Sequence, residues 1–153
     1  MKRSSLARLL PLAALGAVVL LTGCASRFDR AWRNAPAPTK GDRLAGRWEG
    51  QWKSEKHKGH GGRLRGVMIP QGQQRYRAEF KAHWLAFSST YSVNFQTEVR
   101  DGVVHFQGEH DLGRLYGGIY SFIGHADDKT FRASYDSSYD RGMFEMTRPQ
   151  RSR

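Results

Sequence analysis

Two histidines in a glycine-rich segment are the first residues whose types and spacing suggest chemistry. His57 and His60 stand three positions apart within residues 56–62. Imidazoles at this spacing can bind a transition-metal ion, but a durable site needs three or four ligands and further groups that orient them. Glu55 is the only nearby carboxylate, and the lysines on either side of His57 repel a cation. The segment predicts a solvated loop, with His57 and His60 as weak metal candidates.

A second group places an imidazole between two carboxylates. Glu109, His110 and Asp111 carry the side chains that general acid and base catalysis uses. The Leu-Gly pair that follows them favours a turn instead. The sequence contains no phosphate-binding loop, zinc-protease helix or nucleophile elbow. We therefore expect no enzymatic activity, assign no catalytic residue and predict no cofactor.

Cys24 is the only cysteine of the chain and closes an apolar run. Lys2, Arg3 and Arg8 precede residues 9–21, which is the order of a charged and a hydrophobic region in a secretory signal. The run is shorter than the roughly 20 apolar residues that a permanent transmembrane helix needs. The first 23 residues are therefore expected to direct export.

The residues Leu21-Thr22-Gly23-Cys24 resemble the lipobox of bacterial lipoproteins. The resemblance implies that residues 1–23 are removed and that Cys24 receives the lipid that holds the protein on a membrane of the cell envelope. Ala25 follows the cysteine, which favours the outer membrane, facing the periplasm, over the inner membrane. An ordinary signal followed by a chance cysteine is the alternative, although it leaves a free thiol unexplained in an exported protein.

The chain is strongly basic. Its formal charge is +11, and loss of residues 1–23 with their three basic and no acidic residues leaves +8. Basic and aromatic residues that interleave are typical of proteins that bind single-stranded nucleic acid, but export argues against that partner. The expected partners are anionic headgroups or an anionic envelope polymer, with a merely solvated basic surface as the alternative.

Residues 24–43 are predicted to form a flexible tether. Prolines in residues 35–41 favour extended chain, and no apolar period runs through the segment. Phe28 and Trp32 are exceptions that either rest at the lipid headgroups or dock on the domain. Residues 149–153 form a basic tail.

Residues 44–148 show the alternation of apolar and polar side chains that is typical of strands with one dry face. Eight such segments are recognised, and turn signals such as Asp101-Gly102 separate them. The segments lie near residues 44–52, 64–68, 75–84, 87–99, 103–106, 115–124, 131–135 and 142–147. They predict an all-β domain in which an eight-stranded antiparallel up-and-down barrel removes exposed edges. A two-sheet β-sandwich is the main alternative.

The two ends of this domain resemble the lipocalin and wider calycin pattern. Gly46-Arg47-Trp48 opens the first strand, and Arg148 follows the last one. The resemblance implies that Trp48 closes the barrel floor, that Arg148 stacks across it, and that the barrel takes a ligand. An indole face attracts a guanidinium by about 0.5–1 kcal/mol.

Aromatic side chains dominate the face that is predicted to point inward. An eight-stranded barrel either fills its interior or holds one small ligand. The predicted ligand-binding residues are Trp52, Tyr76, Phe80, Trp84, Tyr91, Phe95, Tyr120, Phe122 and Tyr135. Buried phenols need polar partners, which favours a cavity for a small hydrophobic or amphiphilic molecule. A structural or interaction protein with a filled core is the alternative, and metal binding by the loop histidines is a third hypothesis.

Residues 115–124 are apolar on both faces. Leu115, Ile119 and Ile123 therefore form an outward set, as do Val67 and Ile69 on the second strand. Such patches are expected to take a partner subunit, the tether or the membrane.

Overall fold

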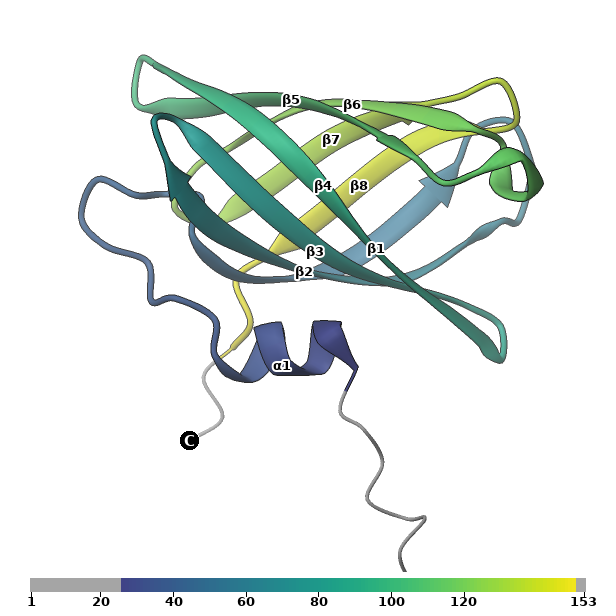
Figure 1. The fold of residues 1–153 in the computed structure, drawn as a ribbon, viewed down its shortest axis with the longest axis horizontal. Helices are drawn as coiled ribbons and strands as arrows, with labels where there is room; N and C mark the ends of the chain where they lie inside the picture. Colours follow the sequence, from purple (N-terminus) through teal and green to yellow (C-terminus); the bar gives the residue numbers. More distant parts are fainter. Residues whose placement is uncertain (1–25, 151–153) are drawn as a thin grey trace, which may run out of the picture.

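The computed structural model describes residues 26–150, which form a closed β-barrel (Figure 1). Each strand pairs antiparallel with the next along the chain, and the first pairs with the last. The strands are β1 (Gly46–Ser54), β2 (Gly61–Gly72), β3 (Arg75–Trp84), β4 (Phe87–Arg100), β5 (Val103–Asp111), β6 (Ile119–Ala126), β7 (Thr130–Asp136) and β8 (Arg141–Thr147). The predicted eight-stranded up-and-down barrel is confirmed, and the sandwich alternative is wrong.

Strict alternation along the strands produces the core. In β8, for example, Gly142, Phe144 and Met146 are buried while the residues between them are exposed. The same alternation places one aromatic or aliphatic set of every strand inside the barrel, where burial of apolar surface stabilises the fold. The core extends from Leu44 to Met146, and every barrel strand is paired along both edges. We therefore expect the chain from residue 26 onward to fold by itself.

A short helix, α1 (Arg27–Arg33), occupies part of the predicted tether. Its first turn is capped by Ser26, whose Oγ accepts a hydrogen bond from the Asp29 backbone N–H over 3.1 Å. Phe28 is buried and Trp32 stacks on it with ring centroids 5.7 Å apart. Residues 27–33 are thus helical where extended chain was expected, and the alternative in which Phe28 and Trp32 dock on the domain is confirmed. Seven residues are too few to show a helical period, and docking on the barrel adds to the Ser26 cap in stabilising them.

Two further expectations fail where strands end. Residues 115–124 were expected to form one strand, yet β6 begins only at Ile119, because Arg114–Tyr116 forms a 3-10 turn and Gly117 and Gly118 adopt positive φ. Glu109, His110 and Asp111 were expected to form a turn, but they continue β5 and pair with β6. The glycine pair decided the first case, and cross-strand pairing, which the local sequence does not encode, decided the second.

The barrel has two unlike ends. We call the end that contains Trp48 and the turns after β2, β4 and β6 the closed end, and the end that contains the turns after β1, β3, β5 and β7 the open end. No helix of residues 26–150 is both long and apolar enough to cross a membrane. The predicted signal at residues 1–23 and the predicted lipidation of Cys24 concern residues outside those that the structure describes.

Candidate functional site at the open end of the barrel

The closed end is blocked by an indole and a guanidinium. Trp48 is fully buried, and its Nε1 donates a hydrogen bond to the Leu44 carbonyl over 2.9 Å. The guanidinium carbon of Arg148 lies 3.7 Å from the centre of this indole ring. Arg148 also donates to the carbonyls of Ala45 and Arg43, both over 2.7 Å. Burial lowers the pKa of Arg148 from its ordinary value, although nearby carboxylates oppose the shift.

Gly46 permits this arrangement. Its φ is +99°, a region that L residues with a side chain rarely adopt. A Cβ at this position would lie 2.8 Å from the Pro36 carbonyl oxygen and 3.3 Å from the Arg148 guanidinium. The glycine therefore lets the entering chain and Arg148 meet beside Trp48, which is the geometry that the lipocalin resemblance implies.

Phenylalanine rings fill the middle of the barrel. Phe80 contacts Phe95 and Phe144 with ring centroids 6.2 and 5.6 Å apart. Phe122 lies 6.4 Å from Phe95 and 5.9 Å from Phe144. Three of the predicted ligand-binding residues, Phe80, Phe95 and Phe122, are at most 2% exposed. The structure places them in a packed layer rather than on the wall of a cavity.

Tyr76 is separated from the other predicted ligand-binding residues. It lies at the closed end, where its hydroxyl donates a 2.6 Å hydrogen bond to Asp42. The same carboxylate oxygen accepts from the Ala45 backbone N–H over 2.9 Å. Burial raises the pKa of Tyr76 well above its ordinary value, and Asp42 raises it further. Tyr76 therefore fastens the entering chain to the barrel.

The five remaining predicted residues gather at the open end above the phenylalanine layer. They are Trp52, Trp84, Tyr91, Tyr120 and Tyr135. Tyr120 lies 6.1 Å from Tyr135 and 6.4 Å from Phe122, and the Trp52 indole donates to the His83 carbonyl over 3.0 Å. All but Tyr135 keep part of their surface in water.

His110 joins this group, 6.5 Å from Tyr91 between ring centroids. His110 was not among the predicted ligand-binding residues because residues 109–111 were expected to form a turn. A signal was present, since Val104, Phe106, Gly108 and His110 continue the inward set of β5 at period two.

A row of four aromatic rings crosses the rim of the open end. Tyr139 lies 5.4 Å from His57, His57 lies 5.3 Å from His60, and His60 lies 4.9 Å from Trp84. The two histidines thus join the turn after β7 to the end of β3. Residues 26–150 contain no group of three or more His, Cys, Asp or Glu side chains arranged to hold a metal ion.

The buried carboxylate of Asp140, in the turn after β7, binds several donors of the open end. Asp140 accepts hydrogen bonds from Ser54 Oγ over 2.6 Å, from the Tyr135 hydroxyl over 3.0 Å and from the Arg141 backbone N–H over 2.8 Å. Ser54 Oγ in turn accepts from the His57 backbone N–H over 2.8 Å. Burial raises the pKa of Tyr135 well above its ordinary value, and the charge of Asp140 adds to this effect. The network connects the aromatic rim to the core.

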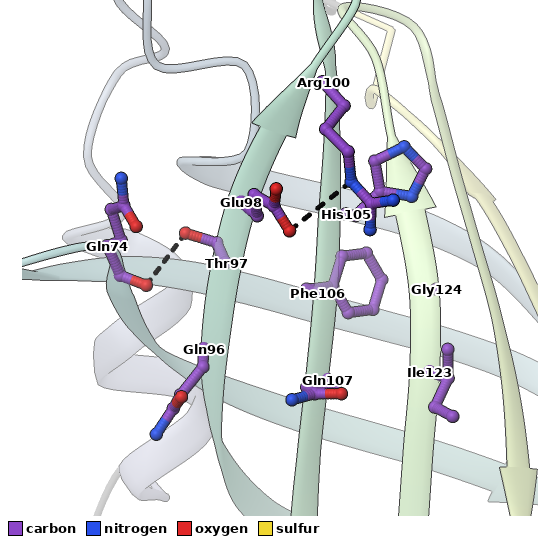
Figure 2. A pocket seen from close by; sticks show the side chains of 10 residues that line it. All are labelled: Gln74, Gln96, Thr97, Glu98, Arg100, His105, Phe106, Gln107, Ile123 and Gly124. Atoms are coloured by element: carbon purple, nitrogen blue, oxygen red, sulfur yellow. Dashed lines mark hydrogen bonds and ion pairs between the residues drawn. The ribbon is translucent and has the colours of Figure 1, made fainter.

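Five hollows among residues 26–150 lie along the outside of the barrel. Figure 2 shows one of them, over the outer face of β4, β5 and β6, where Gln96, Gln107 and His105 are among the lining side chains. Phe122 is the one predicted ligand-binding residue that lines any of these five hollows, and it does so from the barrel wall. The open end is therefore an aromatic surface over a packed floor.

No family model, curated protein or solved structure matches the chain. What the protein does must therefore be argued from this geometry.

Proposed function

We propose that the protein is a lipid-anchored component of the bacterial envelope that binds a small amphiphilic molecule across the open end of its barrel. The observation that carries the proposal is the contrast between the two ends. Trp48 and Arg148 block one end, whereas Trp52, Trp84, Tyr91 and Tyr120 leave partly exposed rings at the other. Partly exposed tryptophan and tyrosine combine an apolar body with a polar tip, which suits a ligand of the same character.

The packed interior limits where a ligand can lie. An apolar chain that entered the barrel axis would have to displace Phe80, Phe122 and Phe144, whose rings contact one another. Displacing packed rings costs several kcal/mol, so a ligand gains more by lying across Trp52 and Trp84. His110 and the tyrosine hydroxyls are then the groups closest to its polar part. The ligand-binding set is thus narrowed to Trp52, Trp84, Tyr91, Tyr120 and Tyr135, with His110 added.

Tryptophan fluorescence tests this site because the chain has four tryptophans, two of which lie at the open end. Native mass spectrometry of protein from its own membranes first shows whether an amphiphile copurifies. Titration with decanoate is then expected to change the emission of the protein, and Trp52→Phe and Trp84→Phe should each remove much of that change. Tyr120→Ala should weaken binding about tenfold, the upper range for an aromatic contact.

Trp32→Phe and Trp48→Phe are the matched controls, because neither residue lies at the open end. Both should keep the response. A response that depends on Trp32 or Trp48, or an emission that decanoate leaves unchanged, would count against this site.

The anchor is tested separately at Cys24. Cys24→Ser removes the thiol that the lipid needs, so most of the protein should move from the membrane pellet to the soluble fraction after cell lysis. Ala25→Ser is the control, since it changes the neighbouring residue and keeps the thiol. A Cys24→Ser protein that stays with the membranes as fully as the control would refute the lipid anchor.

A second candidate function is that of an interaction protein whose barrel is only a scaffold. The filled interior favours it, as does an apolar patch on the outer face. Ile123 pairs across to Ser134 and Ser134 to Met143, so Ile123 and Met143 flank one position of β7. Ile123 is 64% exposed and Met143 is 36% exposed. A native mass spectrum that shows the chain without an amphiphile but bound to a protein would support this candidate instead.

A further inference from the structure

The hairpin between β3 and β4 exposes apolar side chains that neither the fold nor the proposed site explains. Leu85 is 83% exposed and Phe87 is 71% exposed at its tip, and residues 84–90 are all exposed. Leu85 has φ +52°, a conformation in which glycine or asparagine is usual and a leucine is strained. A strained and exposed leucine beside an exposed phenylalanine indicates that this tip contacts something apolar.

The barrel face next to this hairpin is basic. Helix α1 packs on the outer face of β2 and β3 and covers Val67, which points outward and yet has no exposed surface (Figure 1). Ion pairs fix the helix there, from Arg27 to Glu79 over 3.1 Å and from Lys81 to Asp29 over 3.3 Å. The acids of this face are Asp29, Glu49 and Glu79. They are outnumbered by the basic residues Arg27, Arg30, Arg33, Arg47, Arg65, Arg77 and Lys81.

The start of α1 and the tip of the hairpin lie at the same end and on the same side of the barrel. Asp29 contacts Lys81, which precedes Leu85 by four residues on β3, or about 13 Å at the rise of a strand. Figure 1 shows α1 beginning at the side from which the β3–β4 hairpin projects. Cys24 precedes Ser26 by two residues, which span at most about 7 Å. A lipid on Cys24 would therefore enter a membrane close to the hairpin tip.

We propose that the β3–β4 hairpin inserts Leu85 and Phe87 into a bilayer that contains anionic phospholipid, while the arginines of α1 contact its headgroups. The barrel then lies with its β2–β3 side on the membrane. The hairpin and the helix are expected to bind lipid whether or not Cys24 carries an anchor. The further statement that they bind the same membrane as the anchor rests on the proposed function.

The size and surroundings of the tip favour a bilayer over a protein partner. A stable protein interface buries about 1,200 Å² or more, which two loop side chains do not supply. Shallow insertion needs only a few apolar side chains beside basic ones. Trp84, 38% exposed at the base of the tip, has the side chain that membrane interfaces favour.

Vesicle binding of residues 26–153, which lack Cys24, tests the proposal without the anchor. Sedimentation should show binding to vesicles of phosphatidylcholine and phosphatidylglycerol in equal parts and much weaker binding to phosphatidylcholine alone. Leu85→Asn combined with Phe87→Ser should lower the partition coefficient at least tenfold, because both apolar contacts are lost. Val99→Ser is the control, since Val99 is 61% exposed on β4 near the closed end.

Two more comparisons make the test specific. Arg30→Glu should weaken binding to the anionic vesicles several-fold more than Arg100→Glu, which makes the same charge change near the closed end. A polarity-sensitive dye on Leu85→Cys, the single cysteine of residues 26–153, should shift to the blue with vesicles, whereas the same dye on Val99→Cys should not.

The proposal is overturned by an unchanged partition coefficient of the folded Leu85→Asn/Phe87→Ser protein, by an unshifted dye at position 85, or by binding that ignores phosphatidylglycerol. It is also overturned when these substitutions abolish self-association in sedimentation velocity and leave lipid binding intact. Failure of the anchor appears only in the Cys24→Ser experiment, so the two ideas fail separately.

Discussion

Trp48→Ala is expected to lower the free energy of unfolding by about 3–5 kcal/mol, the range for removal of a fully buried aromatic side chain. Trp48 has no exposed surface and packs against Phe131 with ring centroids 5.7 Å apart. Without the indole, Arg148 loses the ring face beneath its guanidinium, and the Leu44 carbonyl loses a donor. Since small domains are stabilised by about 5–15 kcal/mol in total, this change brings the barrel close to unfolding.

Urea unfolding followed by circular dichroism measures the effect. Trp84→Ala removes the same side chain from the open end, where Trp84 is 38% exposed, and should cost only about 1 kcal/mol or less. Equal losses for the two variants would show that the closed end does not hold the barrel together and would remove the basis for treating the two ends as different.

The barrel could be predicted because its signal is repeated. Each strand alternates inward and outward residues, and a residue such as Phe144 between Met143 and Glu145 can face the core in only one register. The pairing of β1 with β8 followed because eight antiparallel strands otherwise leave two exposed edges. Because all eight strands carry this alternation, the two local errors at residues 109–111 and 115–118 did not change the predicted fold.

The helix could not be predicted for a physical reason. Residues 27–33 become helical because Phe28 is buried against the barrel and Asp29 reaches Lys81, a residue 52 positions away. Arg47 also holds the end of the helix, donating to the Trp32 carbonyl over 2.6 Å. Apart from the Ser26 cap these contacts are not local, and residues 27–33 read alone mix aromatic and charged side chains without a helical period.

The candidate site was only partly predictable, because alternation tells which side chains face inward and not how far along the axis they lie. Phe80 and Trp84 share one face of β3, yet Phe80 is fully buried and Trp84 lies on the rim. Whether rings interlock depends on volumes contributed by several strands at one level, as where Phe80, Phe122 and Phe144 meet. The position of a side chain along the barrel axis decides whether it belongs to the closed end, to the packed phenylalanine layer or to the rim of the open end. That position follows from the register of the strands, which the structure supplies.

The buried phenols should make the barrel unusually sensitive to alkali. Burial raises the pKa of Tyr76, Tyr91 and Tyr135 in the folded protein well above the value of about 10 for an unfolded chain. Above pH 10 the unfolded chain loses these protons and the folded barrel keeps them. Stability is therefore complete below pH 10 and is lost as the pH rises above it. Each tyrosine contributes about 1.4 kcal/mol per pH unit above 10, so the three together lower the free energy of unfolding by about 4 kcal/mol between pH 9 and pH 11.

Urea midpoints at pH 9 and pH 11, with phenolate absorbance recorded alongside, measure this loss. Tyr135→Phe keeps the ring that packs 5.2 Å from Phe144 and removes the hydroxyl, so the loss caused by alkali should fall by about a third. Tyr139→Phe, at a side chain that is 60% exposed, is the control and should leave the loss as it is. The same substitution at position 135 also takes one donor from Asp140, which lowers stability at both pH values alike and so does not alter their difference. A Tyr135→Phe barrel that loses as much stability in alkali as the unaltered protein would mean that water reaches this hydroxyl, and the packed floor beneath the open end would then have to be abandoned.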